Sequence, residues 1–148
     1  MTRPAFDLDR FVIAQEPVYP EVLRELRNGH KTSHWMWFIF PQIRGLGRSS
    51  MSRLYAISSL DEATAYLAHP LLGTRLRECT QLVLDVHGKS LTDILGGIDA
   101  VKFCSSMTLF SQATTDSGVF RSALDKYCAG GFDGETIRIL QTPDPHLL

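Results

Sequence analysis

The chain has 148 residues, of which 44% are hydrophobic and 21% are charged, and its formal net charge is −1. This length suits one domain with a core large enough to fold without a metal, so we expect a single domain over residues 1–148. The near balance of charge argues against a protein that binds nucleic acid over its whole surface, and against an acidic disordered tail.

Hydrophobic residues spaced three and four apart predict about eight short helices, whereas the alternation typical of strands is almost absent. Residues suited to cap helix N-termini include Asp7, Ser59, Ser90, Asp99 and Asp133. The expected helices cover residues 8–15, 20–27, 50–57, 63–68, 70–86, 100–113, 119–129 and 133–140. We therefore expect an all-α, mainly helical fold in one compact domain.

The three cysteines, Cys79, Cys104 and Cys128, are odd in number and lack the C-x-x-C spacing of redox and zinc sites. We therefore expect no disulfide framework, no metal site and a reducing, cytoplasmic compartment, with Cys79 and Cys104 as core thiols. The N-terminal residues lack the apolar stretch of a secretory signal. The longest apolar run, residues 35–40, is six residues long and too short to cross a membrane.

Residues 34–42 read HWMWFIFPQ and contain both tryptophans of the chain. One interpretation is a short core helix that the proline ends. The other is the wall of a cavity, lined by Trp35 and Trp37 and faced by the polar side chains of His34 and Gln42. Such a wall would suit a planar ligand, for example a nucleobase.

The next segment, GLGRSS, combines two glycines with residues that favour anion binding. Gly45 and Gly47 permit backbone conformations closed to other residues, and the N–H groups of a helix beginning near Ser49 would attract an anion beside Arg48. The spacing is neither that of a Walker A loop nor that of a Rossmann fingerprint. A plain connection between helices is the alternative interpretation.

No Asp or Glu occurs from residue 26 to residue 60. The basic residues of this stretch are Arg27, Lys31, Arg44, Arg48 and Arg53. Such a local excess of positive charge can focus a field on an anionic ligand. The alternative is a solvated face paired with carboxylates elsewhere. The carboxylates considered are Glu21, Glu25, Asp61 and Glu62.

Lys102, Ser105 and Ser106 fall on one side of the predicted helix 100–113, which contains no acidic residue. A lysine and two hydroxyls on an apolar helix either line a polar pocket or bond to carbonyls four residues earlier. The lysine could also extend to solvent. We favour the pocket, because lysine is a compact, movable charge suited to a phosphate or a carboxylate.

Residues 31–42 (KTSHWMWFIFPQ), 45–49 (GLGRS) and 102–110 (KFCSSMTLF) resemble motifs of a bacterial family catalogued as domain of unknown function 1810. Some members of that family carry the label calpastatin. The likeness extends over nearly the whole chain, from about residue 6 to residue 140. It implies a compact, mainly helical cytoplasmic domain and implies no established activity or cofactor.

These motifs coincide with the features selected by their chemistry. An anion-binding pocket with an aromatic wall forms if six polar residues converge, namely Lys31, His34, Gln42, Arg48, Lys102 and Ser105. We therefore expect binding of a phosphorylated small molecule, such as a nucleotide or an ADP-ribose derivative. In an enzyme acting on that ligand by hydrolysis or group transfer, a histidine within the motif, at position 34, would carry the proton.

The alternative is a non-catalytic module that presents residues 27–53 to an acidic protein or to RNA. Such a module would spread its arginines over an open surface, whereas a pocket would bring them together. Steep salt dependence is typical of binding to nucleic acid. The sequence indicates no membrane partner and no particular oligomeric state.

Overall fold

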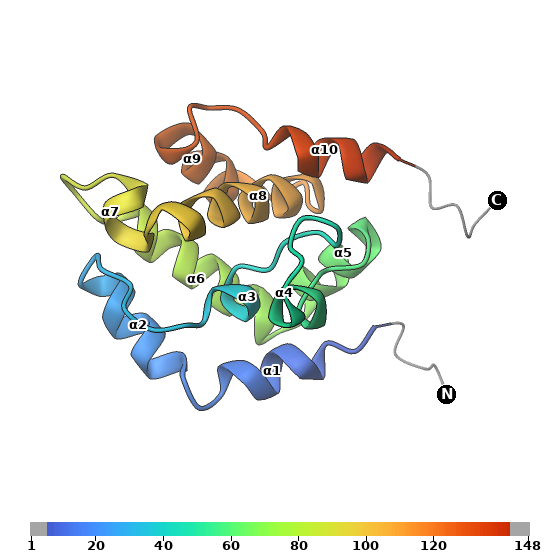
Figure 1. The fold of residues 1–148 in the computed structure, drawn as a ribbon, viewed down its shortest axis with the longest axis horizontal. Coiled ribbons are helices and arrows are strands. Elements are labelled where there is room, and N and C mark those ends of the chain that lie inside the picture. The colour runs from blue at the N-terminus through green and yellow to red at the C-terminus, as the bar shows by residue number, and fades with distance from the viewer. Residues whose placement is uncertain (1–5, 143–148) are drawn as a thin grey trace.

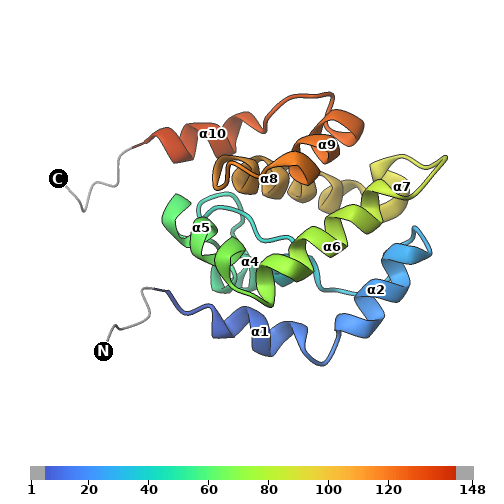
Figure 2. The same cartoon turned by 180° about the vertical axis from the view of Figure 1, so that it is seen from behind.

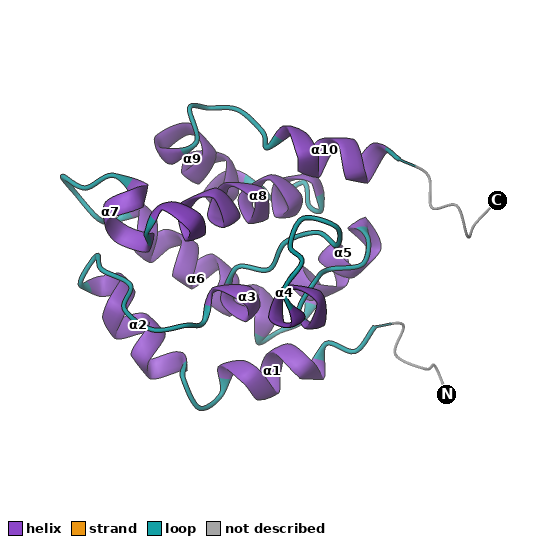
Figure 3. Cartoon of the chain, viewed as in Figure 1, coloured by secondary structure: helices purple, strands orange, loops and turns teal. Residues whose placement is uncertain are grey.

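The computed structural model describes residues 6–142, so residues 1–5 and 143–148 of the expected domain lie outside the described part. Its ten helices, against about eight expected, surround one core (Figures 1 and 3). They are α1 (Asp9–Gln15), α2 (Tyr19–Arg27), α3 (Met36–Ile39), α4 (Ser50–Leu54), α5 (Leu60–Ala68), α6 (Leu72–Leu84), α7 (Leu91–Leu95), α8 (Gly97–Gln112), α9 (Gly118–Tyr127) and α10 (Gly134–Gln141). The all-α prediction is confirmed.

Two helices, α6 and α8, lie at the centre of the packing (Figure 2). Helix α8 contacts α5, α7, α9 and α10, and helix α6 contacts α2, α3, α5 and α9. The second half of α8 is buried around its circumference, as expected for a helix apolar on all sides. None of the helices in residues 6–142 is long and apolar enough to cross a membrane.

Between α3 and α5 the chain is irregular apart from the short helix α4. Ile43 and Ile57 form an isolated parallel bridge, in which the Arg44 N–H donates to the Ile57 carbonyl at 2.8 Å. The Ile57 N–H donates to the Gln42 carbonyl at 2.9 Å. Because residue 57 pairs with this earlier segment, α4 ends at Leu54 rather than at the predicted residue 57.

Three predicted N-caps are confirmed by side-chain hydrogen bonds, namely Ser59, Ser90 and Asp133. Two are wrong. Helix α1 begins at Asp9 without a side-chain cap, so Asp7 lies before it. Helix α8 begins at Gly97, after a glycine with φ of +91°. Asp99 therefore lies inside the first turn of α8, where its carboxylate is available for ion pairs.

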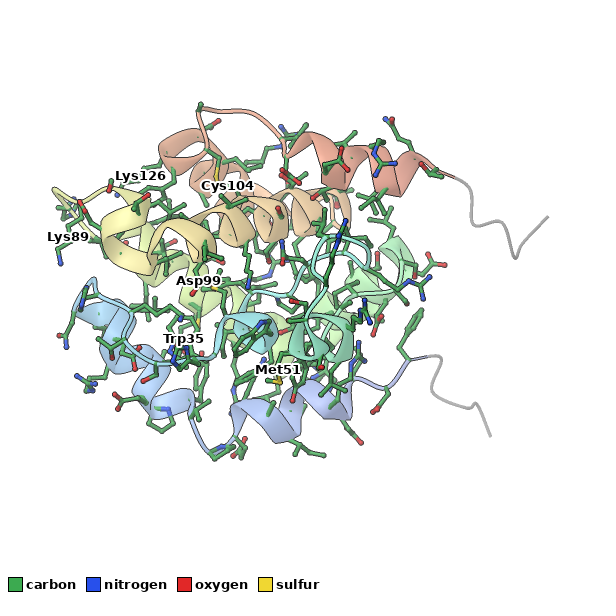
Figure 4. All side chains as sticks on the ribbon, viewed as in Figure 1. Trp35, Met51, Lys89, Asp99, Cys104 and Lys126 are labelled. Atoms are coloured by element: carbon green, nitrogen blue, oxygen red, sulfur yellow. A yellow bond between two sulfur atoms is a disulfide. The ribbon has the colours of Figure 1, made fainter. Side chains whose placement is uncertain are left out.

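A disulfide joins Cys104 on α8 to Cys128, which directly follows α9 (Figure 4, yellow bond beside the Cys104 label). The expectation that the cysteines form no disulfide is therefore wrong, and so is the prediction of a core thiol at Cys104. Cys79 is free and buried, as the prediction of a core thiol requires. The pairing escaped the sequence because the two cysteines are 24 residues apart, and spacing does not reveal which helices pack together.

Replacing Cys128 by serine should lower the free energy of unfolding by about 3–4 kcal/mol, because the cross-link constrains the unfolded chain across 24 residues. Denaturant unfolding without reductant measures the effect. Reductant should lower the stability of the wild type to that of Cys128→Ser and leave the variant unchanged. A wild type equally stable with and without reductant would contradict the assignment.

Candidate functional site

The carboxylate of Glu25 on α2 fixes the connection between α2 and α3. Its Oε1 atom accepts the backbone N–H groups of Thr32 at 2.7 Å and Ser33 at 2.9 Å. It also accepts the indole N–H of Trp35 at 3.1 Å. Glu25 and Trp35 are each 1% exposed. A buried carboxylate therefore anchors the start of the aromatic segment, and the short core helix predicted for that segment is present as α3.

Two opposing effects act on the ionisation of Glu25. Burial raises the pKa of the carboxyl, whereas hydrogen bonds from Ser33, Thr32 and Trp35 favour the charged form and bring the pKa to about 2. The second oxygen, Oε2, is buried and receives no hydrogen bond from the described residues. Glu25 is thus a buried anion in which Oε1 accepts three hydrogen bonds and Oε2 accepts none from the described residues.

A second carboxylate, Asp99, links two lysines of the predicted site. The Lys31 ammonium lies 2.9 Å from Asp99 Oδ2, and the Lys102 ammonium lies 3.9 Å from Asp99 Oδ1. The side chain of Lys31 is 6% exposed and that of Lys102 is 23% exposed. Two cations share one anion here, and the more exposed cation is Lys102.

Both lysines lie over tryptophan rings. Lys31 Nζ lies 4.8 Å from the ring centre of Trp35, and Lys102 Nζ lies 5.6 Å from that of Trp37. Contacts at this distance attract a cation to the ring face. Figure 4 labels Trp35 at the start of α3 and Asp99 at the start of α8. The structure thus brings four predicted residues together with Asp99, and the half-buried Trp37 gives the group an aromatic surface.

The serines of α8 are buried. Ser105 donates its hydroxyl to the Val101 carbonyl at 3.2 Å, which is the back-bonding alternative considered for it. Ser106 is fully buried, and its hydroxyl has no partner among the described residues. By helical spacing, Ser106 shares the face of α8 that carries Asp99 and Lys102. A buried hydroxyl without a hydrogen-bond partner is uncommon, so this face of α8 has a polar group whose partner is missing among the described residues.

The polar residues that flank the aromatic segment differ in exposure. His34 is exposed, and its ring makes no hydrogen bond to any described residue. Gln42 is half-buried, and its backbone carbonyl takes part in the Ile43–Ile57 bridge. His34 is therefore open to solvent beside the buried Trp35, which suits a proton carrier only for a ligand bound at the surface.

The glycine-rich loop has structural roles. A Cβ on Gly47 would lie 2.4 Å from Ser52 Cβ, so only glycine fits there. The Ser49 hydroxyl caps α4 by accepting the Ser52 N–H at 3.1 Å. Gly45 has φ of +105° and approaches α10. Within residues 6–142, neither this loop nor the exposed Arg48 pairs with the lysines. The geometry here is that of the connection considered as the alternative.

The basic stretch divides into one buried cation and an exposed set. Lys31 is enclosed by its ion pair, whereas the arginines of the stretch are exposed. The exposed arginines are Arg27, Arg44, Arg48 and Arg53. In the described part of the chain none of them lies within 4.0 Å of a carboxylate. Glu62 is instead paired with Arg10 at 3.0 Å.

The sequence analysis considered Glu25 only as a partner for the basic stretch and Asp99 only as a helix cap, so it missed their roles at this site. Each lies one residue outside a stretch that contains no acid, 26–60 for Glu25 and 100–115 for Asp99. The acids that border such a stretch are a usable signal, because a buried cation inside it must find its anion nearby in space. Within residues 6–142, no three His, Cys, Asp or Glu side chains are grouped as metal ligands.

A family model described as "Protein of unknown function (DUF1810)" matches residues 5–140. The chain belongs to the DUF1810 family. The chain is similar to the conserved hypothetical protein Rv1873 from Mycobacterium tuberculosis, whose crystal structure matches it with a TM-score of 0.93. The two sequences are 54% identical. The match covers 95% of this chain and 100% of that one. No curated protein sequence matches the chain. The predicted DUF1810 resemblance is confirmed.

Glu25 should make the stability of this DUF1810 chain depend on pH. Because folding lowers the pKa of Glu25 from 4.5 to about 2, its stabilising contribution is complete above pH 4.5 and disappears as the pH falls toward 2. Glu25→Gln cannot titrate, so its free energy of unfolding should be lower above pH 4.5 and should decline less below it. Urea unfolding at several pH values tests this, and identical slopes in both proteins would contradict it.

Proposed function

We propose that this DUF1810 chain binds a phosphorylated small molecule with a planar group, such as a nucleotide or an ADP-ribose derivative, beside Lys102 and Trp37. The observation that carries the proposal is the sharing of Asp99 by two lysines against tryptophan rings. The partly exposed ammonium of Lys102 can attract an anion, and the exposed part of the Trp37 ring offers a stacking surface.

The two lysines have different roles in this proposal. Lys31 also donates to the Ser33 carbonyl at 2.6 Å, so its pairing holds the aromatic connection in place. Lys102 is more exposed and lies farther from Asp99, so its ammonium is the one available to a phosphate. The predicted ligand residues of the glycine loop do not contact the ligand in this proposal and contribute only to the fold.

If the ligand is turned over, His34 is the residue proposed to transfer the proton, in a hydrolysis or a group transfer. It is exposed next to the anchored Trp35, and histidine titrates near neutral pH. His34→Ala should then retain ligand binding and lose turnover, because the exposed ring makes no hydrogen bond to a described residue and its removal should leave the fold unchanged.

A second candidate function is favoured by a different observation. Arg44, Arg48 and Arg53 are exposed on one short segment and make no ion pair within the described residues. Several exposed, unpaired arginines on one segment are typical of a surface that binds an acidic protein or RNA. This candidate places binding on the α3–α5 segment instead of on α8.

Two variants that each remove one positive charge, at Lys102 or at Arg48, distinguish the two functions. Nucleotides, NAD, ADP-ribose, sugar phosphates and a short RNA are tested for their effect on the thermal midpoint of the wild type, Lys102→Gln and Arg48→Gln. A small ligand at a hundred times its dissociation constant should raise the wild-type midpoint by about 5–10 °C. Lys102→Gln should lose this shift, and the matched charge removal at Arg48 should retain it.

The opposite pattern favours the second function. Binding of RNA that weakens steeply with salt, survives Lys102→Gln and is lost in Arg48→Gln would place recognition on the arginine segment. A small-ligand shift that is equal in all three proteins would overturn the role proposed for Lys102.

A further inference from the structure

A hollow of about 450 Å³ lies on the other face of α8 from Lys102. Its walls come from three places: the start of α7 at Leu91, the α8 residues Ala100 and Val101, and the end of α9 with the segment that follows, including Tyr127 and Phe132. Its volume is within the range of sites that bind small molecules. The hollow is independent of the proposed anion site.

The disulfide forms part of the wall of this hollow. Cys104 and Cys128 both line it, and both are partly exposed. A disulfide that solvent-borne thiols can reach is open to exchange, whereas an enclosed one is not. Cys79, by contrast, is 1% exposed, and burial raises the pKa of its thiol to about 12. The chain therefore presents one accessible disulfide and one inert thiol.

We propose that this hollow is a site of thiol–disulfide exchange, in which a small thiol with an apolar body reacts with the Cys104–Cys128 disulfide. The thiolate attacks one cysteine sulfur, a mixed disulfide forms, and the other cysteine leaves as a thiolate. A second thiolate attacks the mixed disulfide and releases the oxidised small molecule. Two thiols are thereby oxidised to one disulfide, and the protein disulfide is reduced to two thiols.

The residues at the rim of the hollow favour a thiol with an apolar body. Val101 is 65% exposed and Phe132 is 42% exposed, so two apolar side chains border the opening. The Arg121 guanidinium lies 5.0 Å from the ring centre of Phe132 and provides positive potential for an approaching thiolate. The one carboxylate in the lining, Asp133, is occupied in capping α10. An aromatic or aliphatic body suits these walls.

Exchange does not require the fold to open. The end of α9 is held independently of the disulfide, because the Tyr127 hydroxyl donates to the Val83 carbonyl at 2.7 Å. The Gly130 N–H also donates to the Leu124 carbonyl at 3.0 Å. Helix α9 therefore stays packed on α6 and α8 while the cysteine that follows it changes partner.

The experiment uses the oxidised full-length protein and phenylmethanethiol as the probe, with 2-mercaptoethanol for comparison. Intact mass and peptide mapping follow the mixed disulfide over time, and each rate is normalised to the same thiol reacting with a small open-chain disulfide. We expect adducts on Cys104 or Cys128 of the native protein, a normalised preference for the apolar thiol, and no adduct on Cys79.

Charge at the rim provides the matched control. Val101→Glu should slow the reaction about threefold and Val101→Lys should speed it by a similar factor, through repulsion or attraction of the thiolate in water. The same changes at Ile98, which is 78% exposed on α8 but does not line the hollow, should have less effect. The proposal is overturned if native protein reacts only as fast as it unfolds, if both positions respond equally, or if the purified protein contains free thiols at Cys104 and Cys128.

Discussion

The Lys31 ammonium and the Asp99 carboxylate, 2.9 Å apart and nearly enclosed, join the α2–α3 connection to the first turn of α8. A buried pair of this kind is costly to break, because removing one partner leaves an uncompensated charge. Glu25 acts on the same connection from the other side by accepting two backbone N–H groups and the Trp35 indole. Together the two carboxylates hold Trp35 and the two lysines of the candidate site in place.

The helical fold could be predicted because most helices bury a stripe of residues spaced three and four apart, as on α6. Local signals failed where a tertiary partner decided the outcome. Helix α4 ends early because Ile57 pairs with Ile43. Helix α8 begins early at Gly97, so Asp99 forms ion pairs instead of capping a helix. The disulfide depends on the packing of α8 against α9, which no spacing in the sequence reveals.

The candidate site was predictable in part for the same reason. Residue chemistry selected Lys31, Lys102 and the tryptophans, which the structure brings together. It also selected Ser49 and Gly47, which have structural roles that need no ligand. Ser49 caps α4, and Gly47 packs closely against Ser52. Helix α8 carries Lys102 on one face and Cys104 on the other, so the proposed anion binding and the proposed thiol exchange can be tested separately.

A double-mutant cycle on Lys31→Met and Asp99→Asn measures the interaction on which this account depends. The free energies of unfolding of the wild type, both single variants and the double variant give the coupling between the two side chains. We expect a coupling of about 2 kcal/mol, with the double variant more stable than the sum of the single losses implies. Losses that add to within about 0.5 kcal/mol would show that the pair does not fix the α2–α3 connection to α8.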